Sequence, residues 1–344
     1  MMKFGLTFSL QVPPGSGVSW QQPYRDMLEC LPRAEDLGYN SSFQVSHHAQ
    51  KDGLCPGPLI ACAGAAAVTR TMRIGTGVLL VPLYAPLKLA EDIAVLDNLA
   101  GGRFVFGVAP GYVAAEFDAH GIPREERVQR FEEALDLMTT AWTEDTFSFD
   151  GQFYQVPETR MTPKPVQSPH PPLWYGVSAK ASLRRAARRH AVQIMSPRHG
   201  PEELQEHFAV YEAEANKIGW NITERPIMRT VFIAETKARA EEIAAPALNY
   251  LFTELYGAAS AAGERVLRAA DGSVITDKTQ VSFDTFKNRY IIGDPEFAIE
   301  QLAIYEQAVR PTEVICWMHL PGISGADAMR SVELFAREVM PHFA

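Results

Sequence analysis

The stretch RIGTGVLLVPLYAPLKLAEDIAVLDNLAGGRFVFGV, residues 73–108, holds the pattern that decides the fold. It opens with a largely apolar run, RIGTGVLLV. It continues into APLKLAEDIAVLDNLAGG, whose apolar residues recur at helical spacing and which ends at two glycines. A second apolar run, RFVFGV, follows at once. A strand, a helix and a strand in this order predict two parallel strands joined by a crossover helix.

The same alternation extends along the whole chain. Eight strands are predicted, and because most are continuous apolar runs they indicate a parallel sheet covered by helices. The number eight favours a closed (β/α)8 barrel, the TIM-barrel fold. An open doubly wound sheet is the alternative, but no GxGxxG loop follows the first strand. The predicted strands are residues 3–10, 41–46, 72–81, 103–111, 171–177, 192–196, 226–235 and 313–320.

Two stretches interrupt the alternation. After the fourth strand, FSFDGQFYQV (147–156) places the turn residues Asp150 and Gly151 between alternating apolar residues, which predicts a β-hairpin excursion. After the seventh strand, residues 250–290 follow neither pattern clearly. We therefore expect one barrel domain over residues 1–344, with 250–290 as an insertion or lid that keeps water out of the barrel mouth.

The composition narrows the class of protein. With 344 residues, of which 47% are hydrophobic and 21% charged, the chain can bury a large core. Its net charge of −9, with 32 basic residues spread along the chain, argues against a nucleic-acid-binding surface. The four cysteines have no CxxC or metal-ligand spacing and are expected as reduced thiols of a cytoplasmic protein. Neither a membrane span nor an export signal is expected.

The carboxyl ends of barrel strands form the active site in this fold, so their residues define a candidate pocket. Two histidines follow the second strand, and only one of them can face the pocket because adjacent strand residues point to opposite faces. Almost no acidic side chain is expected here and no carboxylate beside the histidines, which argues against a zinc hydrolase. The candidates are Ser46, His47 or His48, Tyr112, Ser178, Ser182, Arg198, His199 and His319.

The stretch GVSAKAS (176–182) follows the fifth strand and begins a helix. Small hydroxyl residues at a helix start can hold a phosphate, because backbone N–H groups and the positive end of the helix point at it. The alternative is that Ser178 only caps the helix. Arg184 and Arg185, one turn further on, are expected to be solvated charges on the helix surface.

The ordered set of motifs resembles the bacterial-luciferase-like flavin monooxygenases over essentially the whole chain. The segment 73–108 is the most specific part of the resemblance. The other motifs are SHHAQ (46–50), EFDAHGIPREER (116–127), FYQV (153–156), PKPVQSPHPPLW (163–174), IIGDPEFAIEQL (291–302) and MRSVELFAREVMPHF (329–343).

The resemblance implies a barrel, often a homodimer, that binds reduced FMN (FMNH2) supplied by an NAD(P)H:flavin reductase. In this family the flavin reacts with O2 to form a C4a-peroxide, which oxygenates a small organic substrate. A sister group on the same fold transfers hydride with a deazaflavin, and this is the first alternative for the present chain. A non-catalytic flavin-binding protein is the second.

The resemblance also assigns roles to residues. His47 matches the catalytic histidine after the second strand, with His48 as a structural residue. Gly77 and Val78 match a non-prolyl cis peptide beneath the flavin ring. The FMN phosphate site matches Ser178, Ala179 and Ser182. Apart from the resemblance, Tyr112 is expected either beside the phosphate or ribitol or packed against the following helix. Ser46 and His319 are expected to contact substrate or flavin, His319 from the barrel mouth with Ile315 and Trp317 turned the same way.

Three positions depart from the family pattern. Ser46 stands where many relatives have a glutamate before the paired histidines. Pro110 stands where many have an arginine that holds the phosphate, and proline supplies neither charge nor an N–H donor. We expect Arg198, one strand further round, to take over that charge. The turn GISGADAM (322–329) lacks a histidine that relatives often carry. Neither the substrate nor the reductase can be named from the sequence.

Overall fold

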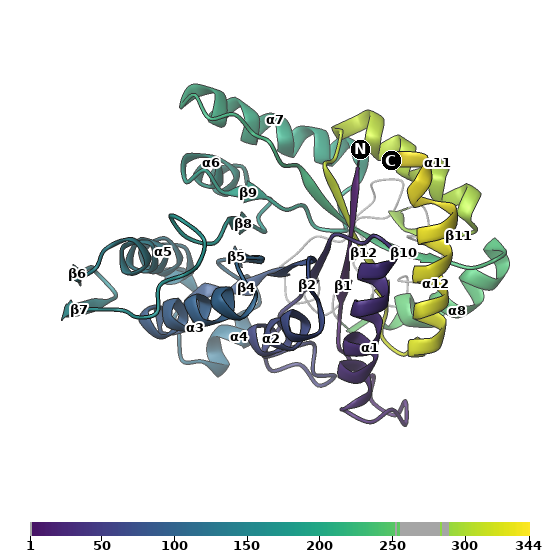
Figure 1. Cartoon of the computed structure of the whole chain (residues 1–344), viewed down its shortest axis with the longest axis horizontal. Coiled ribbons are helices and arrows are strands. Elements are labelled where there is room, and N and C mark those ends of the chain that lie inside the picture. Colours follow the sequence, from purple (N-terminus) through teal and green to yellow (C-terminus); the bar gives the residue numbers. More distant parts are fainter. Residues whose placement is uncertain (1, 252, 255–282, 284–288) are drawn as a thin grey trace.

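Parallel strands form a closed ring in the middle of the computed structural model, which describes residues 2–251, 253–254, 283 and 289–344 (Figure 1). Each strand is hydrogen-bonded to its neighbours in the order β10, β12, β1, β2, β3, β5, β8, β9. A parallel bridge between Met195 and Ile227 closes the ring from the end of β9 to β10, and the Met228 N–H donates to the Met195 carbonyl at 3.0 Å. The predicted (β/α)8 barrel is therefore confirmed. Its strands are β1 (Lys3–Phe8), β2 (Ser41–Gln44), β3 (Arg73–Thr76), β5 (Phe104–Ala109), β8 (Leu173–Tyr175), β9 (Val192–Gln193), β10 (Pro226–Ile233) and β12 (Glu313–His319).

Helices cover the outside of the ring (Figure 1). The α-helices are α1 (Gln22–Asp36), α2 (Pro58–Val68), α3 (Pro86–Leu99), α4 (Ala114–Ala119), α5 (Arg127–Thr143), α6 (Lys180–Arg188), α7 (Pro201–Lys217), α8 (Lys237–Leu251), α11 (Pro295–Val309) and α12 (Gly325–Glu338). Short 3-10 helices lie at Val81–Leu83, Arg124–Glu126 and Met340–Phe343. The two chain ends meet, because the Met2 N–H donates to the Phe343 carbonyl at 3.0 Å.

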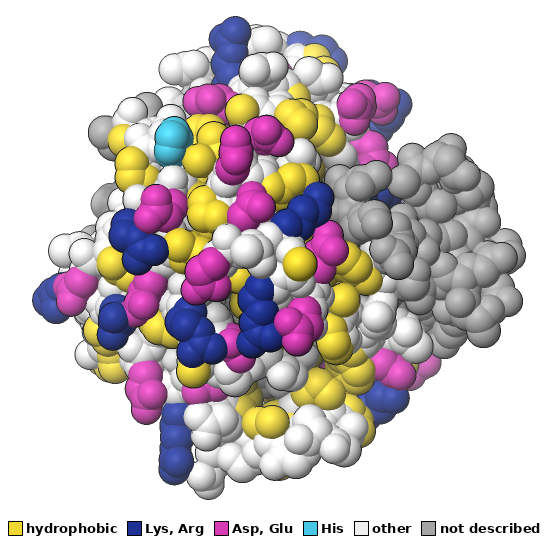
Figure 2. All heavy atoms as spheres, turned by 90° about the vertical axis from the view of Figure 1, so that its right-hand side faces the viewer, with side chains coloured by type: hydrophobic (Ala, Val, Ile, Leu, Met, Phe, Trp, Pro, Cys, Tyr) yellow, Lys and Arg dark blue, Asp and Glu magenta, His cyan; other side chains and the backbone are white. Residues whose placement is uncertain are grey.

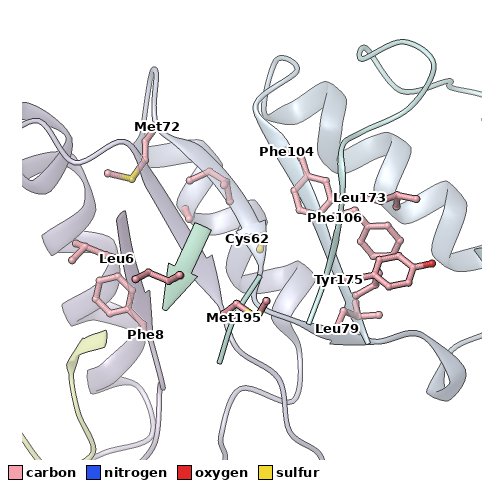
Figure 3. Close-up of a cluster of buried hydrophobic side chains, with 14 of the residues drawn as sticks. Leu6, Phe8, Cys62, Met72, Leu79, Phe104, Phe106, Leu173, Tyr175 and Met195 are labelled. Carbon is pink, nitrogen blue, oxygen red and sulfur yellow. The ribbon is translucent and has the colours of Figure 1, made fainter. Parts of the chain in front are cut away.

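The strands separate an apolar cluster inside the ring from a larger one outside it, and a third cluster packs around α8. Phe43, Val105, Trp174, Ile194, Met228 and Ile315 fill the inside of the barrel. Residues at alternate positions point outwards into the larger core beneath the helices. In Figure 3, Phe104 and Phe106 of β5 lie beside Leu173 and Tyr175 of β8. Leu6 and Phe8 of β1, on another part of the barrel wall, also belong to this outer core. This alternation fixes which residues at the strand ends reach the barrel mouth.

The predicted hairpin is present as the antiparallel pair β6 (Phe147–Asp150) and β7 (Gln155–Thr159), at the left edge of Figure 1. The carboxylate of Glu133 on α5 holds its turn by accepting hydrogen bonds from the backbone N–H groups of Gln152, Phe153 and Tyr154. The excursion is thus tied to the helix that precedes it.

Other details differ from the predictions. The third predicted strand is divided at Gly77, so that β4 (Leu79–Leu80) pairs separately with β5. The short helix α4 and the strand β11 (Ile291–Gly293), which pairs with β10, are not predicted from the sequence. The predicted insertion over residues 250–290 lies largely outside the described residues.

On the face that Figure 2 shows, basic side chains stand among acidic and apolar ones rather than in a patch of their own. This face carries α8, α11 and α12, which lie on the right-hand side of Figure 1. Among the described helices, none combines the length and the apolar character that a membrane span needs.

Candidate active site

A cavity of about 610 Å³ opens at the carboxyl ends of the barrel strands. Its size is typical of a pocket for a cofactor or another small molecule. The structure brings nearly all the candidate residues together around this one space. Those that line it are Ser46, His47, Gly77, Val78, Tyr112, Ser178, Ala179, Ser182, Arg198 and His199.

His47 is held by a buried carboxylate. Its Nδ1 lies 2.9 Å from Oε1 of Glu116, a fully buried residue of α4. The same oxygen accepts a hydrogen bond from the backbone N–H of His48 at 2.8 Å. Because the carboxylate oxygen is an acceptor, Nδ1 of His47 carries the proton, and Nε2 is left for exchange with a ligand. The pair can therefore take up and release a proton at Nε2.

Glu116 corrects the expectation that the histidines have no carboxylate neighbour. Position 46 itself is a serine, and a carboxylate reaches His47 from α4. The signal lies in the loop APGYVAAEF (109–117) after the fourth predicted strand, where Glu116 is the one acidic residue. A single acidic residue in a loop does not reveal by itself which strand end it contacts.

His48 points away from the cavity, as expected. It is buried, with its Nε2 3.3 Å from the Ser46 hydroxyl, and its ring packs edge-on against Tyr84 and His120. Burial lowers the His48 pKa because the charged form would lose its hydration. Tyr112 packs edge-on against the His47 ring, with centroids 6.1 Å apart.

The peptide bond between Gly77 and Val78 is cis, as the resemblance implies. Two glycines make room for this segment, Gly107 of β5 and Gly176 just after β8. A Cβ at Gly176 would lie 2.8 Å from Val78 Cγ1, and one at Gly107 would lie 1.8 Å from the Thr76 carbonyl oxygen. Glycine at both positions lets Val78 and Gly77 line the wall of the cavity.

The first turn of α6 forms another part of the wall. The helix begins at Lys180, and its N-cap is Ala179 without a side-chain hydrogen bond, so the alternative that Ser178 caps the helix is wrong. The first N–H groups of an α-helix have no acceptor within the helix. The Ser182 hydroxyl oxygen accepts a hydrogen bond from Arg185 Nη2 at 2.8 Å, which leaves its own hydrogen for another acceptor. Arg185 is thus part-buried and structural, not the solvated charge that the sequence predicts.

Three arginines line the same cavity. Arg198 follows β9 and lines the cavity, and its compensation for Pro110 stays a prediction. Arg127, at the start of α5, and Arg289, just before β11, are not identified from the sequence. Among the described lining residues, these three arginines are the basic side chains other than histidine, and Glu203 of α7 is the acidic one.

His319 does not reach the barrel mouth, and the prediction of its orientation is wrong. Trp317 lines the large cavity, but His319 is absent from its described lining. His319 Nε2 instead lies 3.5 Å from Asp26 Oδ2, in a separate small space between β1, α1 and α12. The cause is a bulge: consecutive residues Thr7 and Phe8 of β1 pair with Trp317 and His319, and the extra residue reverses the alternation.

Comparisons with known proteins agree with this architecture. A sequence model described as luciferase-like monooxygenase matches residues 2–310. The chain is 27% identical over 335 residues to the oxygenase component of flavin-dependent trigonelline monooxygenase from Acinetobacter baylyi, with 94% of this chain and 91% of that protein covered.

Two solved structures share the fold. Monooxygenase RslO1 from Streptomyces bottropensis has a TM-score of 0.87 and 24% identity, with 100% of both chains covered. The oxygenating constituent of 3,6-diketocamphane monooxygenase from Pseudomonas putida, in complex with FMN, has a TM-score of 0.83 and 21% identity, with 99% of both chains covered. The family match extends over most of the chain, from the first strand to the end of α11. The chain therefore belongs to the luciferase-like monooxygenase family.

Proposed function

We propose that this protein is the oxygenase of an FMN-dependent monooxygenase system, which uses reduced FMN and O2 to add one oxygen atom to a small organic substrate. One observation carries the proposal: His47, backed by Glu116, lines the same cavity as the first turn of α6. The pair of His47 and Glu116 is suited to proton transfer, and the first turn of α6 is suited to holding a phosphate.

The residues around the cavity suit a flavin mononucleotide. Ser178 and Ser182 offer hydroxyl groups, α6 offers backbone N–H groups, and Arg127 and Arg198 offer charge for the phosphate. Apolar side chains that include Val78, Leu80, Met228 and Trp317 provide a surface for a flat ring system.

Bound reduced flavin supplies the electrons that activate O2. The protein holds the proton that this chemistry requires. His47 gives or takes a proton at Nε2, and Glu116 stabilises the positively charged imidazole through Nδ1. Tyr112 packs edge-on against the His47 imidazole and keeps that imidazole in place. Apolar lining residues such as Val45 and Leu54 limit the entry of water near His47.

The partners follow from the same proposal. We propose that a separate NAD(P)H:flavin reductase supplies the reduced FMN, an arrangement supported by the relative that is named as an oxygenase component. A homodimer and a cytoplasmic location stay predictions, as does a single domain with a lid at 250–290. All four cysteines are buried free thiols, as a reducing compartment would keep them.

The test is an anaerobic titration of the purified protein with reduced FMN and, separately, with a reduced deazaflavin. Saturable binding of reduced FMN is expected, followed by transfer of one atom from isotopically labelled O2 to a member of a panel of aldehydes, ketones and sulfonates. Binding of the deazaflavin alone, with hydride transfer and no oxygen incorporation, would support the deazaflavin enzyme instead.

His47→Ala separates an oxygenase from a non-catalytic flavin-binding protein. The variant should still bind reduced FMN, because His47 lies apart from the residues that suit the phosphate. Its oxygenation rate should fall by about 100-fold or more, the usual contribution of a general acid or base. Equal product yields from the variant and the wild type would remove His47 from the mechanism.

A further inference from the structure

Arg229 of β10 is buried behind the wall of the cavity. Its side chain is 1% exposed, and its guanidinium lies 4.5 Å from the ring centroid of Tyr305 on α11. Nη1 donates to the Tyr305 hydroxyl at 2.6 Å, and Nε donates to the carbonyl of Met228 at 2.6 Å. An arginine in such a position is costly to bury unless its donors are used.

The remaining donors hold a cavity loop. Nη1 donates to the His199 carbonyl at 2.7 Å, and Nη2 donates to the Ser196 carbonyl at 3.0 Å. These two carbonyls lie on either side of Arg198, whose Nε donates to the Ser196 hydroxyl at 3.3 Å. Ser196, Arg198 and His199 all line the cavity, so Arg229 fixes both ends of the short loop that carries a cavity arginine.

The charge of Arg229 has no carboxylate partner among the described residues, because its hydrogen bonds all go to carbonyl and hydroxyl oxygens. Arginine stays protonated in proteins. A buried guanidinium that is balanced only by dipoles adds positive potential to the adjacent wall and favours an anion there.

We propose that Arg229 is a positioning residue for the phosphate of the flavin. It holds the loop 196–199 so that Arg198 meets the phosphate, and its own charge adds to the attraction without contact. This inference rests on the proposed function, since it takes the phosphate of FMN as the anion. Arg229 lies outside the cavity. Under this proposal it nevertheless helps to determine how strongly the site prefers FMN over a flavin without a phosphate.

The experiment compares Arg229→Met with the wild type by anaerobic titration with reduced FMN and with reduced riboflavin, which lacks the phosphate. If the loop 196–199 shifts and Arg198 no longer meets the phosphate, the loss of that charged contact should raise the Kd for FMN by about 10- to 100-fold. The Kd for riboflavin should hardly change, so the ratio of the two constants collapses towards one.

Arg103→Met is the matched control. Arg103 also donates to backbone carbonyls, those of Ala66, Thr69 and Met72, but it does so at the opposite end of the barrel, before β5. This variant should lose stability and keep the FMN-to-riboflavin ratio. If Arg229→Met does not fold, Tyr305→Phe removes one acceptor of Nη1 and should move the same ratio towards one by a smaller factor.

The possible outcomes separate two failures. An unchanged ratio in folded Arg229→Met, or in Tyr305→Phe where the first variant does not fold, would overturn the role of Arg229 while leaving the flavin site intact. An equal loss for both flavins would make Arg229 merely structural and would also overturn it. A wild-type protein that binds neither flavin would refute the proposed function itself, and the inference with it.

Discussion

The chemistry of His47 depends on a residue that lies 69 positions further along the chain. The imidazole alone would be a weakly oriented group at a strand end. Glu116 fixes the proton on Nδ1, and the backbone N–H of His48 in turn fixes Glu116. At the scale of single residues, the site is thus a buried carboxylate and an imidazole that act as one unit.

Replacing Glu116 by Gln should test this unit. Glutamine keeps the size and an acceptor atom but removes the negative charge, so the charged form of His47 loses its stabilisation. We expect kcat to fall by about 10- to 100-fold with little change in the Kd for reduced FMN. Steady-state oxygenation and anaerobic titration measure the two quantities.

Glu133→Gln is the control, because Glu133 also accepts several hydrogen bonds but holds the hairpin outside the barrel. Its kcat should equal that of the wild type. A wild-type kcat in Glu116→Gln would show that the carboxylate has no part in proton transfer.

The sequence predicts that His47 faces the cavity, but it does not predict that Glu116 contacts His47. Strand alternation is a local rule, and it suffices to separate His47 from His48. The contact of Glu116 with His47 depends on how two loops meet, which no local pattern encodes. His319 fails for a related reason, since one bulged residue in β12 reverses a rule that holds at Ile315 and Trp317.

At the scale of elements, Glu35 ties α1 to the start of β3. Its carboxylate accepts hydrogen bonds from the backbone N–H groups of Arg70, Thr71 and Met72. Burial raises the pKa of Glu35, but these hydrogen bonds outweigh burial and lower the pKa from 4.5 to about 2. The carboxylate therefore stabilises the folded state in its charged form.

Glu35→Gln should lower the free energy of unfolding at pH 7 by about 2–3 kcal/mol. Since the folded-state pKa is the lower one, the stabilisation is complete above pH 4.5 and is lost as the pH falls towards 2. Urea unfolding of both proteins across this range should give curves that converge in acid. Glu338→Gln, at an exposed surface position, is the control and should change little; a Glu35→Gln difference that stays constant down to pH 2 would contradict the account.

Gly107 lets β5 approach β3. A Cβ there would lie 1.8 Å from the Thr76 carbonyl oxygen, a backbone atom that cannot move aside. Gly107→Ala should therefore cost about 3 kcal/mol or more, or prevent folding. In Gly57→Ala the nearest atom would be 3.5 Å away, at the end of the Ile60 side chain, so thermal unfolding should show a much smaller loss. Equal melting temperatures for the two variants would refute this reason for the glycine.

Elements that lie within a clear apolar run or beside turn residues are predictable here, even where the strand itself is short. The barrel strands and the hairpin β6–β7 follow from apolar runs and turn residues. The helix α4 and the strand β11 lie in stretches where the sequence shows no clear alternation, and tertiary contacts decide them. Because α4 carries Glu116, the element that the sequence misses is also the one that completes the site.

At the scale of the whole molecule, all four cysteines lie in the cores as free thiols. Burial raises the pKa of Cys30 and of Cys55 to about 12, and it also raises the pKa of Cys62 and Cys316, because a thiolate would lack hydration there. In the native protein at pH 8, Ellman's reagent should react slowly with all of them, and denaturation should release all four. Rapid modification of the native protein would contradict this packing.

The closed ring itself is the most predictable feature of the molecule. Apolar runs repeated eight times leave few architectures in which each strand is buried on both faces. What the ring encloses is less predictable, because the cavity lining combines Arg127, Arg198 and Arg289 from three distant parts of the chain. The fold predicts only that the site lies at the carboxyl ends of the strands.

One placement supports the whole account: the His47 imidazole and the first turn of α6 line the same cavity, which we propose as the FMN site. A crystal structure of the protein with bound FMN tests this most directly. The account predicts the phosphate against Ser178, Ser182 and Arg198, and the reactive edge of the ring beside His47. A phosphate bound elsewhere, or a ring that His47 cannot reach, would contradict it.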